Sequence, residues 1–255
     1  MQHSQICQEA LTEIEAALLA EGQSISPHKA AERAFCMKTP MAMIGLSVPQ
    51  QRARLKVGYS FSHLDFEEQL PIWTHVWNAA NYHEAKMQAA FFVERPNRTI
   101  DPVWLWDQLV PWVASVNCWD QSDTLSDVLS HLNERIPDHT APTLERWNVS
   151  EQPWERRQSL VALLFYSRLR ESFPEPELVF RLVECRLGDP DYYVQKAVGW
   201  TLREAYHVWP EEAVHFLDRH VGVLAPAAWQ AATEKLPAKT KQVLKAKRKA
   251  GREKS

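Results

Sequence analysis

The chain has 255 residues, of which 45% are hydrophobic and 24% charged, so it has enough apolar material for a substantial core, and disorder is excluded except at its ends. Glycine is scarce at seven residues, and the 16 prolines stand mostly beside gaps between apolar-periodic segments. Such punctuation is typical of a chain of helices. The net charge of -3 excludes no class of partner by itself, because the charge is unevenly distributed.

Several chemistries are disfavoured by missing motifs. The four cysteines stand far apart and form no CxxC pair, which argues against a zinc cluster and a disulfide framework: Cys7, Cys36, Cys118 and Cys185. HExxH, GxSxG and glycine-rich phosphate motifs are missing too. The chain starts without a basic-then-apolar leader, and no run approaches the ~20 apolar residues of a membrane span. We therefore expect a soluble, cytoplasmic protein that uses no metal and no cofactor.

Apolar residues recur at helical spacing along the chain, and the breaks between the periodic segments are short and polar. The expected helices include residues 6–18, 71–80, 85–93, 103–116, 154–169, 178–187 and 193–206. No extended alternating pattern demands a β-sheet. The sequence therefore predicts an all-α protein in which successive helices pack as antiparallel neighbours.

Two of the expected helices look alike, because each has an aromatic residue, a basic residue three positions on, and then an apolar run. One begins at Trp154 and the other at Tyr193, and their basic residues, Arg157 and Lys196, are 39 residues apart. A spacing of ~40 suits HEAT or armadillo repeats, in which helix pairs stack into a curved α-solenoid with a concave face. Residues 83–93 resemble an earlier copy. We predict one HEAT-like repeat domain over residues 1–236.

Basic residues concentrate at the C-terminal end of the chain. Residues 235–255 contain nine Lys or Arg against the single acid Glu253, which leaves residues 1–234 with 20 basic and 31 acidic side chains and a net charge of -11. We interpret residues 237–255 as a basic tail. Such a tail is either a solvated extension or an arm that binds phosphate.

The most suggestive local arrangement is the segment NCWDQSD at residues 117–123. Trp119 and Asp123 are four residues apart and share one helical face, and an aromatic ring beside a carboxylate can recognise a cation. In the alternative interpretation, Asp120 caps the helix and Asp123 is a solvated acid of the first turn, stabilised by the helix macrodipole. The residues alone leave both interpretations open.

Two arginines, Arg156 and Arg157, follow Pro153 at the predicted start of a helix. Basic side chains at this place either hold phosphate oxygens or pair with neighbouring acids. Residue types and spacing thus describe a helical solenoid with an aromatic and acidic groove, and no more.

Together with three further segments, these features resemble the DNA alkylation repair family of HEAT-like glycosylases, the AlkD-like proteins, over about residues 31–236. The matching segments are AFCMKT at 34–39, IGL at 44–46, VPQQR at 48–52, Trp119 with Asp123, WERR at 154–157, and VQKAVGWTLRE at 194–204. The last segment is the most specific match. The order and spacing of the segments carry the resemblance.

The resemblance implies an enzyme that removes positively charged purines, alkylated at ring nitrogen three or seven, from double-stranded DNA without a metal. Studied bacterial members do so without flipping the base into a pocket. Asp123 then takes the place of the essential carboxylate, and Trp119 and Trp200 match the aromatics that contact the lesion nucleotide. Arg157 matches the arginine that holds a backbone phosphate. Further candidates for backbone contacts are Lys38, Arg156, Lys196 and Arg203.

The sequence departs from the family pattern at Cys36, which stands beside Phe35 where a tyrosine is common. The family also contains members that bind unusual DNA structures without excising bases. Three expectations therefore compete: a monofunctional alkylpurine glycosylase, a structure-selective DNA-binding protein, and a HEAT adaptor that binds a protein in its concave face. We expect the protein to be a monomer. We expect the ring faces of Trp119 and Trp200 to line the groove rather than to fill the core.

Overall fold

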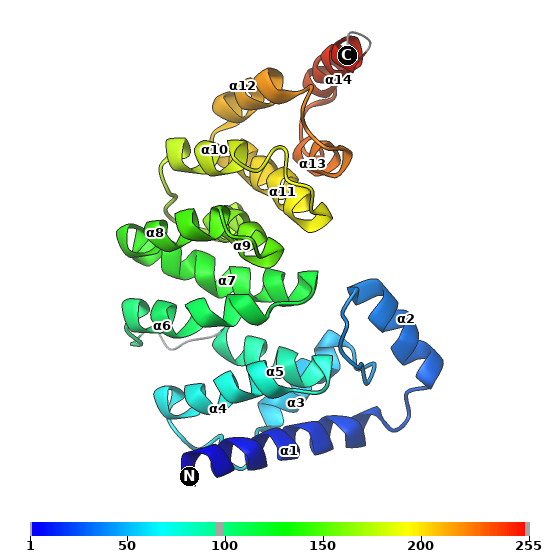
Figure 1. Ribbon diagram of the computed structural model, residues 1–255, viewed down its shortest axis with the longest axis vertical. Helices are drawn as coiled ribbons and strands as arrows, with labels where there is room; N and C mark the ends of the chain where they lie inside the picture. The colour runs from blue at the N-terminus through cyan, green and yellow to red at the C-terminus, as the bar shows by residue number, and fades with distance from the viewer. Residues whose placement is uncertain (1, 95–98, 253–255) are drawn as a thin grey trace. The chain divides into compact units, whose positions relative to one another are not determined.

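The computed structural model describes residues 2–94 and 99–252 (Figure 1). Over these residues the fold is all-helical, as predicted, and the one β-type contact is an isolated bridge between Ala42 and Tyr82. None of the described helices has the length and apolar character needed to cross a membrane. The chain forms two compact units, Met1–Val128 and Leu129–Ser255, and the boundary between them falls inside helix α7.

The first unit is built around a buried helix, α5, which packs against α3, α4 and α1. All residues of α5 except Phe92 are buried. The helices of this unit are α1 (Gln2–Gly22), α2 (Pro27–Met37), α3 (Val48–Val57), α4 (Phe66–Ala79), α5 (His83–Val93), α6 (Pro102–Leu109), the 3-10 helix η1 (Val110–Ser115) and the first part of α7 (Trp119–Arg135). A helix so buried must satisfy its own polar side chains within the protein.

The buried side chain of Glu84 in α5 is satisfied by hydrogen bonds from the backbone of the loop before α3. Its carboxylate, which is fully buried, accepts the backbone N–H groups of Ile44 at 3.0 Å, Gly45 at 2.6 Å and Leu46 at 3.2 Å. Gly45 has a φ of 93°, and a Cβ there would lie 3.0 Å from Cα of Ala30. This loop therefore needs both the buried anion and a residue without a side chain.

Helix α2 is held differently, because none of its side chains is buried. Ser26 caps its first turn by accepting the N–H of Lys29, and Lys38 ends it in the left-handed conformation with a φ of 55°. The side chain of Arg33 donates to the carbonyl of Gly45. In Figure 1 α2 projects to one side of α5. Capping and a few hydrogen bonds, rather than apolar burial, keep this helix in place.

In the second unit, α9 packs against α8, α10 and α11, and α11 packs against α12 and α13. Most helices of the second unit begin with proline. The backbone N–H that proline lacks has no partner within the first turn of a helix, so its loss does not weaken the helix. The unit contains the last part of α7, α8 (Pro137–Asn148), α9 (Pro153–Leu164), the 3-10 helix η2 (Ser167–Leu169), α10 (Pro176–Glu184), α11 (Tyr192–Val208), α12 (Pro210–His220), α13 (Pro226–Ala232) and α14 (Ala238–Arg252).

The residues that begin the two similar sequences, in α9 and α11, contact each other. The rings of Trp154 and Tyr193 stack with their centroids 5.2 Å apart, and Thr201 donates to the carbonyl of Leu160 at 3.1 Å. On the other side of α11, a Cβ on Gly199 would lie only 2.5 Å from the carbonyl oxygen of Ala228 in α13. The spacing of 39 residues thus corresponds to stacked neighbouring helices, as predicted. The curvature of the array stays a prediction.

Residues 238–252 form helix α14 and are not a loose tail. Leu244 and Arg248 are buried, and the guanidinium of Arg248 donates to the carbonyls of Val221 and Leu224 at 2.6 Å each. Lys247 forms an ion pair with Asp218 on α12 at 2.6 Å. The interpretation as a solvated extension is therefore wrong for these residues, because buried contacts hold the helix. A role in phosphate binding stays a prediction.

Candidate functional site

The first turns of α7 carry Trp119 and Asp123, one helical turn apart and both half-buried. The indole N–H of Trp119 donates to the backbone carbonyl of Cys36 at the end of α2, at 3.3 Å. Because this bond uses only the main chain of Cys36, a cysteine side chain at that position is compatible with it. The ring of Trp119 is neither a fully buried core residue nor fully exposed, in line with a place beside a groove.

The neighbouring Asp120 is locked into a hydrogen-bond network. One carboxylate oxygen accepts Nε2–H of His83 at 2.9 Å, and the other accepts the thiol of Cys118 and the backbone N–H of Gln121, both at 3.0 Å. His83 is 1% exposed and the Asp120 side chain 16%. Burial by itself raises the pKa of Asp120, but the hydrogen bonds led by that from His83 outweigh it and hold the pKa below its usual value. Asp120 thus accepts a backbone N–H in the first turn, as the capping interpretation expects, but the side chain of His83 also binds it.

His83, Cys118 and Asp120 also have the donor types that bind metal ions, and their donor atoms lie within 4.8 Å of one another. Burial raises the pKa of the Cys118 thiol, and its bond to Asp120 keeps the thiol protonated. On the other side of the imidazole, Nδ1 accepts the side-chain N–H of Gln121 at 3.4 Å. Because these groups satisfy one another, the cluster works as a hydrogen-bonded anchor for the first turn of α7.

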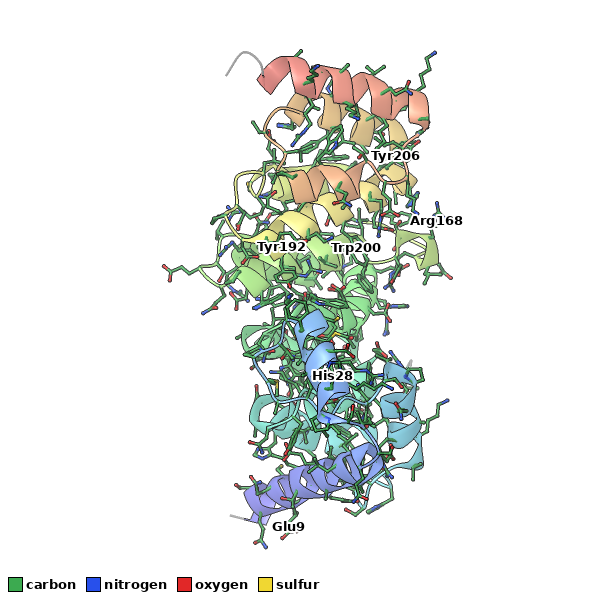
Figure 2. All side chains as sticks on the ribbon, turned by 90° about the vertical axis from the view of Figure 1, so that its right-hand side faces the viewer. Glu9, His28, Arg168, Tyr192, Trp200 and Tyr206 are labelled. Atoms are coloured by element: carbon green, nitrogen blue, oxygen red, sulfur yellow. The ribbon has the colours of Figure 1, made fainter. Side chains whose placement is uncertain are left out.

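In the second unit, Lys196, Trp200 and Arg203 share one face of α11, since they are four and three residues apart. The half-buried ring of Trp200 stacks on Phe165 with centroids 5.4 Å apart, and the guanidinium of Arg203 lies 4.8 Å from its centroid. Figure 2 shows this face, with Trp200 between Tyr192 and Arg168. Stacking on two sides fixes the plane of the indole.

The indole N–H of Trp200 is buried and has no hydrogen-bond partner in the described part of the chain. An unsatisfied donor costs about 1–3 kcal/mol. The position of this ring is therefore explained by its stacking contacts and not by its polar group.

Tyr166 belongs to the same aromatic group, although the sequence analysis did not single it out. It is 48% exposed, has a φ of 48° and meets Trp200 edge-on, with centroids 5.8 Å apart. Glu204 holds the following residue in place by accepting the backbone N–H and the hydroxyl of Ser167. Because tyrosine has no preference for the left-handed region, no local sequence signal marks this conformation.

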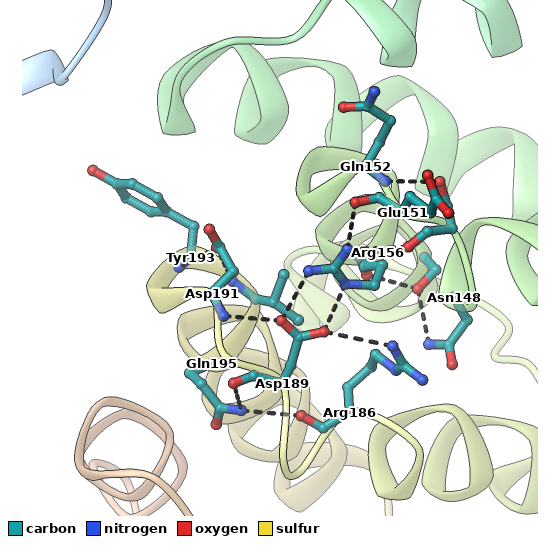
Figure 3. Close-up of polar contacts among 12 residues, drawn as sticks. Asn148, Glu151, Gln152, Arg156, Arg186, Asp189, Asp191, Tyr193 and Gln195 are labelled. Atoms are coloured by element: carbon teal, nitrogen blue, oxygen red, sulfur yellow. Dashed lines mark hydrogen bonds and ion pairs between the residues drawn. The ribbon is translucent and has the colours of Figure 1, made fainter.

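Arg156 is fully engaged within the protein (Figure 3). Its guanidinium holds Asp189 through two bonds, of 2.6 and 3.1 Å, and donates to the carbonyls of Ser150 at 3.0 Å and Glu151 at 2.8 Å. Burial favours a raised pKa for Asp189, but the bonds from Arg156 lower it. Arg156 thus clamps the start of α9 to the loop before α11. This arrangement favours a structural role over the predicted backbone contact.

The predicted phosphate ligand Arg157 is 97% buried, since its exposed fraction is 3%. One terminal nitrogen donates to the carbonyl of Tyr193 at 2.8 Å. A phosphate could reach the guanidinium only through the small exposed part of this residue. The role of Arg157 in DNA binding stays a prediction.

The remaining candidates for backbone contacts divide into two kinds. Lys38 and Lys196 are exposed, and Nζ of Lys38 lies 3.4 Å from the ring centroid of Phe35, which is itself 72% exposed. Arg203, by contrast, is paired with Glu204 at 3.1 Å and Glu234 at 3.0 Å. The two lysines are therefore the more accessible of these cations.

Comparisons with known proteins agree with the arrangement of helices. The sequence matches the family model described as DNA alkylation repair enzyme over residues 15–236. No curated protein sequence matches the chain.

Three solved structures share the fold at low sequence identity. One, titled as a predicted DNA alkylation repair enzyme from Enterococcus faecalis, is 20% identical with a TM-score of 0.68, covering 84% of this chain and 97% of that one. AlkD2 from Streptococcus mutans is 18% identical with a TM-score of 0.55, covering 76% and 92%. The protein smu.31 from Streptococcus mutans UA159 is 17% identical with a TM-score of 0.54, covering 74% and 93%. These similarities show the helical-repeat fold.

Proposed function

The chain belongs to the DNA alkylation repair enzyme family, and from this premise we propose that it is a monofunctional glycosylase. Its substrate is duplex DNA with positively charged alkylated purines, whose N-glycosidic bond it hydrolyses. The observation that carries the proposal is the start of α7, where Trp119 and Asp123 share a face while Asp120 is bound by His83. This arrangement favours Asp123 over Asp120 as the carboxylate that acts on substrate.

The chemistry explains why a fixed anion suffices. Alkylation already gives the purine a positive charge, so the base leaves without being protonated by the enzyme. The enzyme must stabilise oxocarbenium character on the sugar and direct a water to the anomeric carbon, and Asp123 serves both tasks. The rings of Trp119 and Trp200 favour the cationic nucleotide by about 0.5 to 2 kcal/mol each.

Binding of DNA depends on exposed cations, because residues 1–234 have a net charge of -11 and repel phosphate. Lys38 and Lys196 are exposed and supply the contacts to the DNA backbone in this proposal. Each phosphate contact releases counterions, so affinity for duplex DNA is expected to fall steeply as the salt concentration rises.

The test is base release under single-turnover conditions from a duplex with 7-methylguanine or 3-methyladenine. Wild type is expected to release free purine, and Asp123→Asn to lose about 10²-fold or more in rate, about 2.7 kcal/mol, with hardly any change in affinity. Asn keeps the shape and removes only the charge. The matched control is Asp107→Asn, at an exposed acid of α6, which should leave the rate unchanged.

Lesion dependence sharpens this test. Because 7-methylguanine leaves more slowly unaided than 3-methyladenine, the loss in Asp123→Asn should be larger for 7-methylguanine. Equal rates for wild type and Asp123→Asn on both lesions contradict the assignment. Duplex binding by wild type without any base release favours a structure-selective DNA-binding protein, and no salt-dependent binding favours a protein adaptor.

A further inference from the structure

A cleft of about 700 Å³ lies between α13 and α14, at the end of the second unit. Pro226 and Trp229 of α13 form one wall, and Lys245, Ala246 and Lys249 of α14 form the other. Every charged side chain in its lining is basic. The cleft thus combines apolar walls, one aromatic ring and positive charge.

Helix α14 presents these lysines from a fixed position. Arg248, only 6% exposed, bonds the carbonyls of Val221 and Leu224, and Lys247 pairs with Asp218. The lysines that line the cleft therefore stand on a helix whose orientation is set by buried bonds, so its charge is preorganised toward a ligand.

Trp229 is half-buried, and the guanidinium of Arg248 lies 5.1 Å from its ring centroid. An aromatic platform beside a basic groove is the arrangement that binds single-stranded nucleic acid, in which bases stack on rings and cations follow the backbone. Duplex DNA keeps the faces of its bases stacked inside the helix and offers no ring face for stacking on such a surface. The apolar walls and the ring therefore favour an unpaired base as the occupant.

We propose that this cleft binds single-stranded DNA, with an unpaired base against Trp229 and the flanking phosphates at Lys245 and Lys249. Charge complementarity supports the choice of partner, because the basic lining belongs to a chain whose residues 1–234 are otherwise acidic. The cleft is formed by other residues than the candidate repair site on α7 and α11. Binding there does not require base excision.

The test uses the full chain and a fluorescent oligothymidylate of about 12 nucleotides, within the ~4–16 nucleotides of known single-strand sites. Trp229→Leu is expected to weaken binding by about 5- to 100-fold, and Trp229→Phe, which keeps a ring, by less. Lys245→Gln combined with Lys249→Gln should reduce the salt slope by about 1.4, because each single-strand phosphate contact contributes ~0.7. The matched control combines Lys235→Gln with Lys239→Gln, two exposed lysines outside the cleft.

Unchanged affinity in Trp229→Leu overturns the proposal, and so does an equal loss of affinity in the control pair. A polyglutamate peptide that binds as tightly as the oligonucleotide, with the same dependence on Trp229, assigns the cleft to acidic proteins instead. Circular dichroism checks the fold of each variant. If Trp229→Leu does not fold, the exposed Lys245 and Lys249 decide the question through the salt slope. This experiment measures binding of a single strand and not base release, so failure of the glycosylase proposal leaves the test intact.

Discussion

The start of α7 in the first unit and the face of α11 in the second unit each present a half-buried tryptophan, but different forces hold them. Behind Trp119 lies a buried polar network centred on His83 and Asp120. Around Trp200 the contacts are stacked rings and a guanidinium, and its own N–H has no partner in the described residues. Hydrogen bonds thus fix the direction of the groups behind Trp119, whereas stacking fixes the plane of the Trp200 ring.

This difference agrees with the roles proposed for the two regions. A carboxylate that stabilises a transition state must be held in one direction, and hydrogen bonds inside a protein provide directional order. A ring that contacts a nucleotide needs a fixed plane, which stacking on Phe165 provides. Substitutions that remove one kind of contact at a time can break or sharpen this comparison.

Among substitutions of polar side chains, the largest effect is expected for His83→Ala, which removes the donor to a largely buried Asp120. A buried acceptor left unsatisfied costs about 1–3 kcal/mol and a charged one more, and because Asp120 keeps some water contact, we expect a loss of about 3 kcal/mol in the free energy of unfolding, measured in urea. His83→Gln keeps an N–H donor and is expected to lose less. If His83→Ala loses under 1 kcal/mol, the network does not anchor α7.

Asp189→Asn tests the polar clamp of the second unit, which lies away from the Trp200 stack. It weakens the bidentate pair with Arg156, and we expect a loss of about 2 kcal/mol in unfolding free energy, since hydrogen bonds to charged groups contribute ~1.5–3 kcal/mol. Asp138→Asn, at an exposed acid of α8, is the control. If the two variants unfold at the same urea concentration, the pair of Asp189 and Arg156 does not contribute to stability.

The same pair predicts a dependence on pH. The pKa of Asp189 is lowered in the folded state, so the stabilisation is complete above the unfolded pKa of about 3.9 and is lost as pH falls through the folded pKa. The difference in stability between wild type and Asp189→Asn should therefore be constant from about pH 5 to 7 and shrink below pH 4. A difference that grows as pH falls has the wrong sign for this interaction.

A smaller effect is expected for Gly199→Ala, which tests the close approach of α11 and α13 beside Trp200. The new Cβ would lie 2.5 Å from the Ala228 carbonyl oxygen, so backbone must move, at a cost of about 1–2 kcal/mol in thermal unfolding. Gly188→Ala, where a Cβ meets no atom within 4 Å, is the matched control. Equal melting temperatures for both variants would show that α13 can shift away from the new Cβ without loss of stability.

The smallest effect is expected for Phe35→Ala on α2, the helix without buried side chains. Phe35 is 72% exposed and contacts Lys38, so stability should change by less than about 0.5 kcal/mol. Phe91→Ala, at a buried position of α5, is the contrasting variant and should lose about 3–5 kcal/mol. A comparable loss at Phe35 indicates that α2 packs more tightly than its exposure suggests.

Local patterns in the sequence were sufficient to predict the all-helical fold, the stacking of α9 on α11 and the shared face of Trp119 and Asp123. Each depends on helical periodicity or on a fixed repeat length, and both are visible within a short stretch of chain. The same reasoning singled out Asp123 by its shared face with Trp119 and gave Asp120 a capping role, but it identified no side-chain partner for either acid.

Only the tertiary structure showed that a side chain binds Asp120, because its partner His83 is 37 residues away in the sequence. The buried anion Glu84, the left-handed Tyr166 and the packing of α14 were likewise unpredictable. Each depends on which turn of one helix faces which turn of another. Helical periodicity determines the face that a residue occupies, whereas the register between stacked helices, and hence the partner of each polar group, is set by packing across the whole unit.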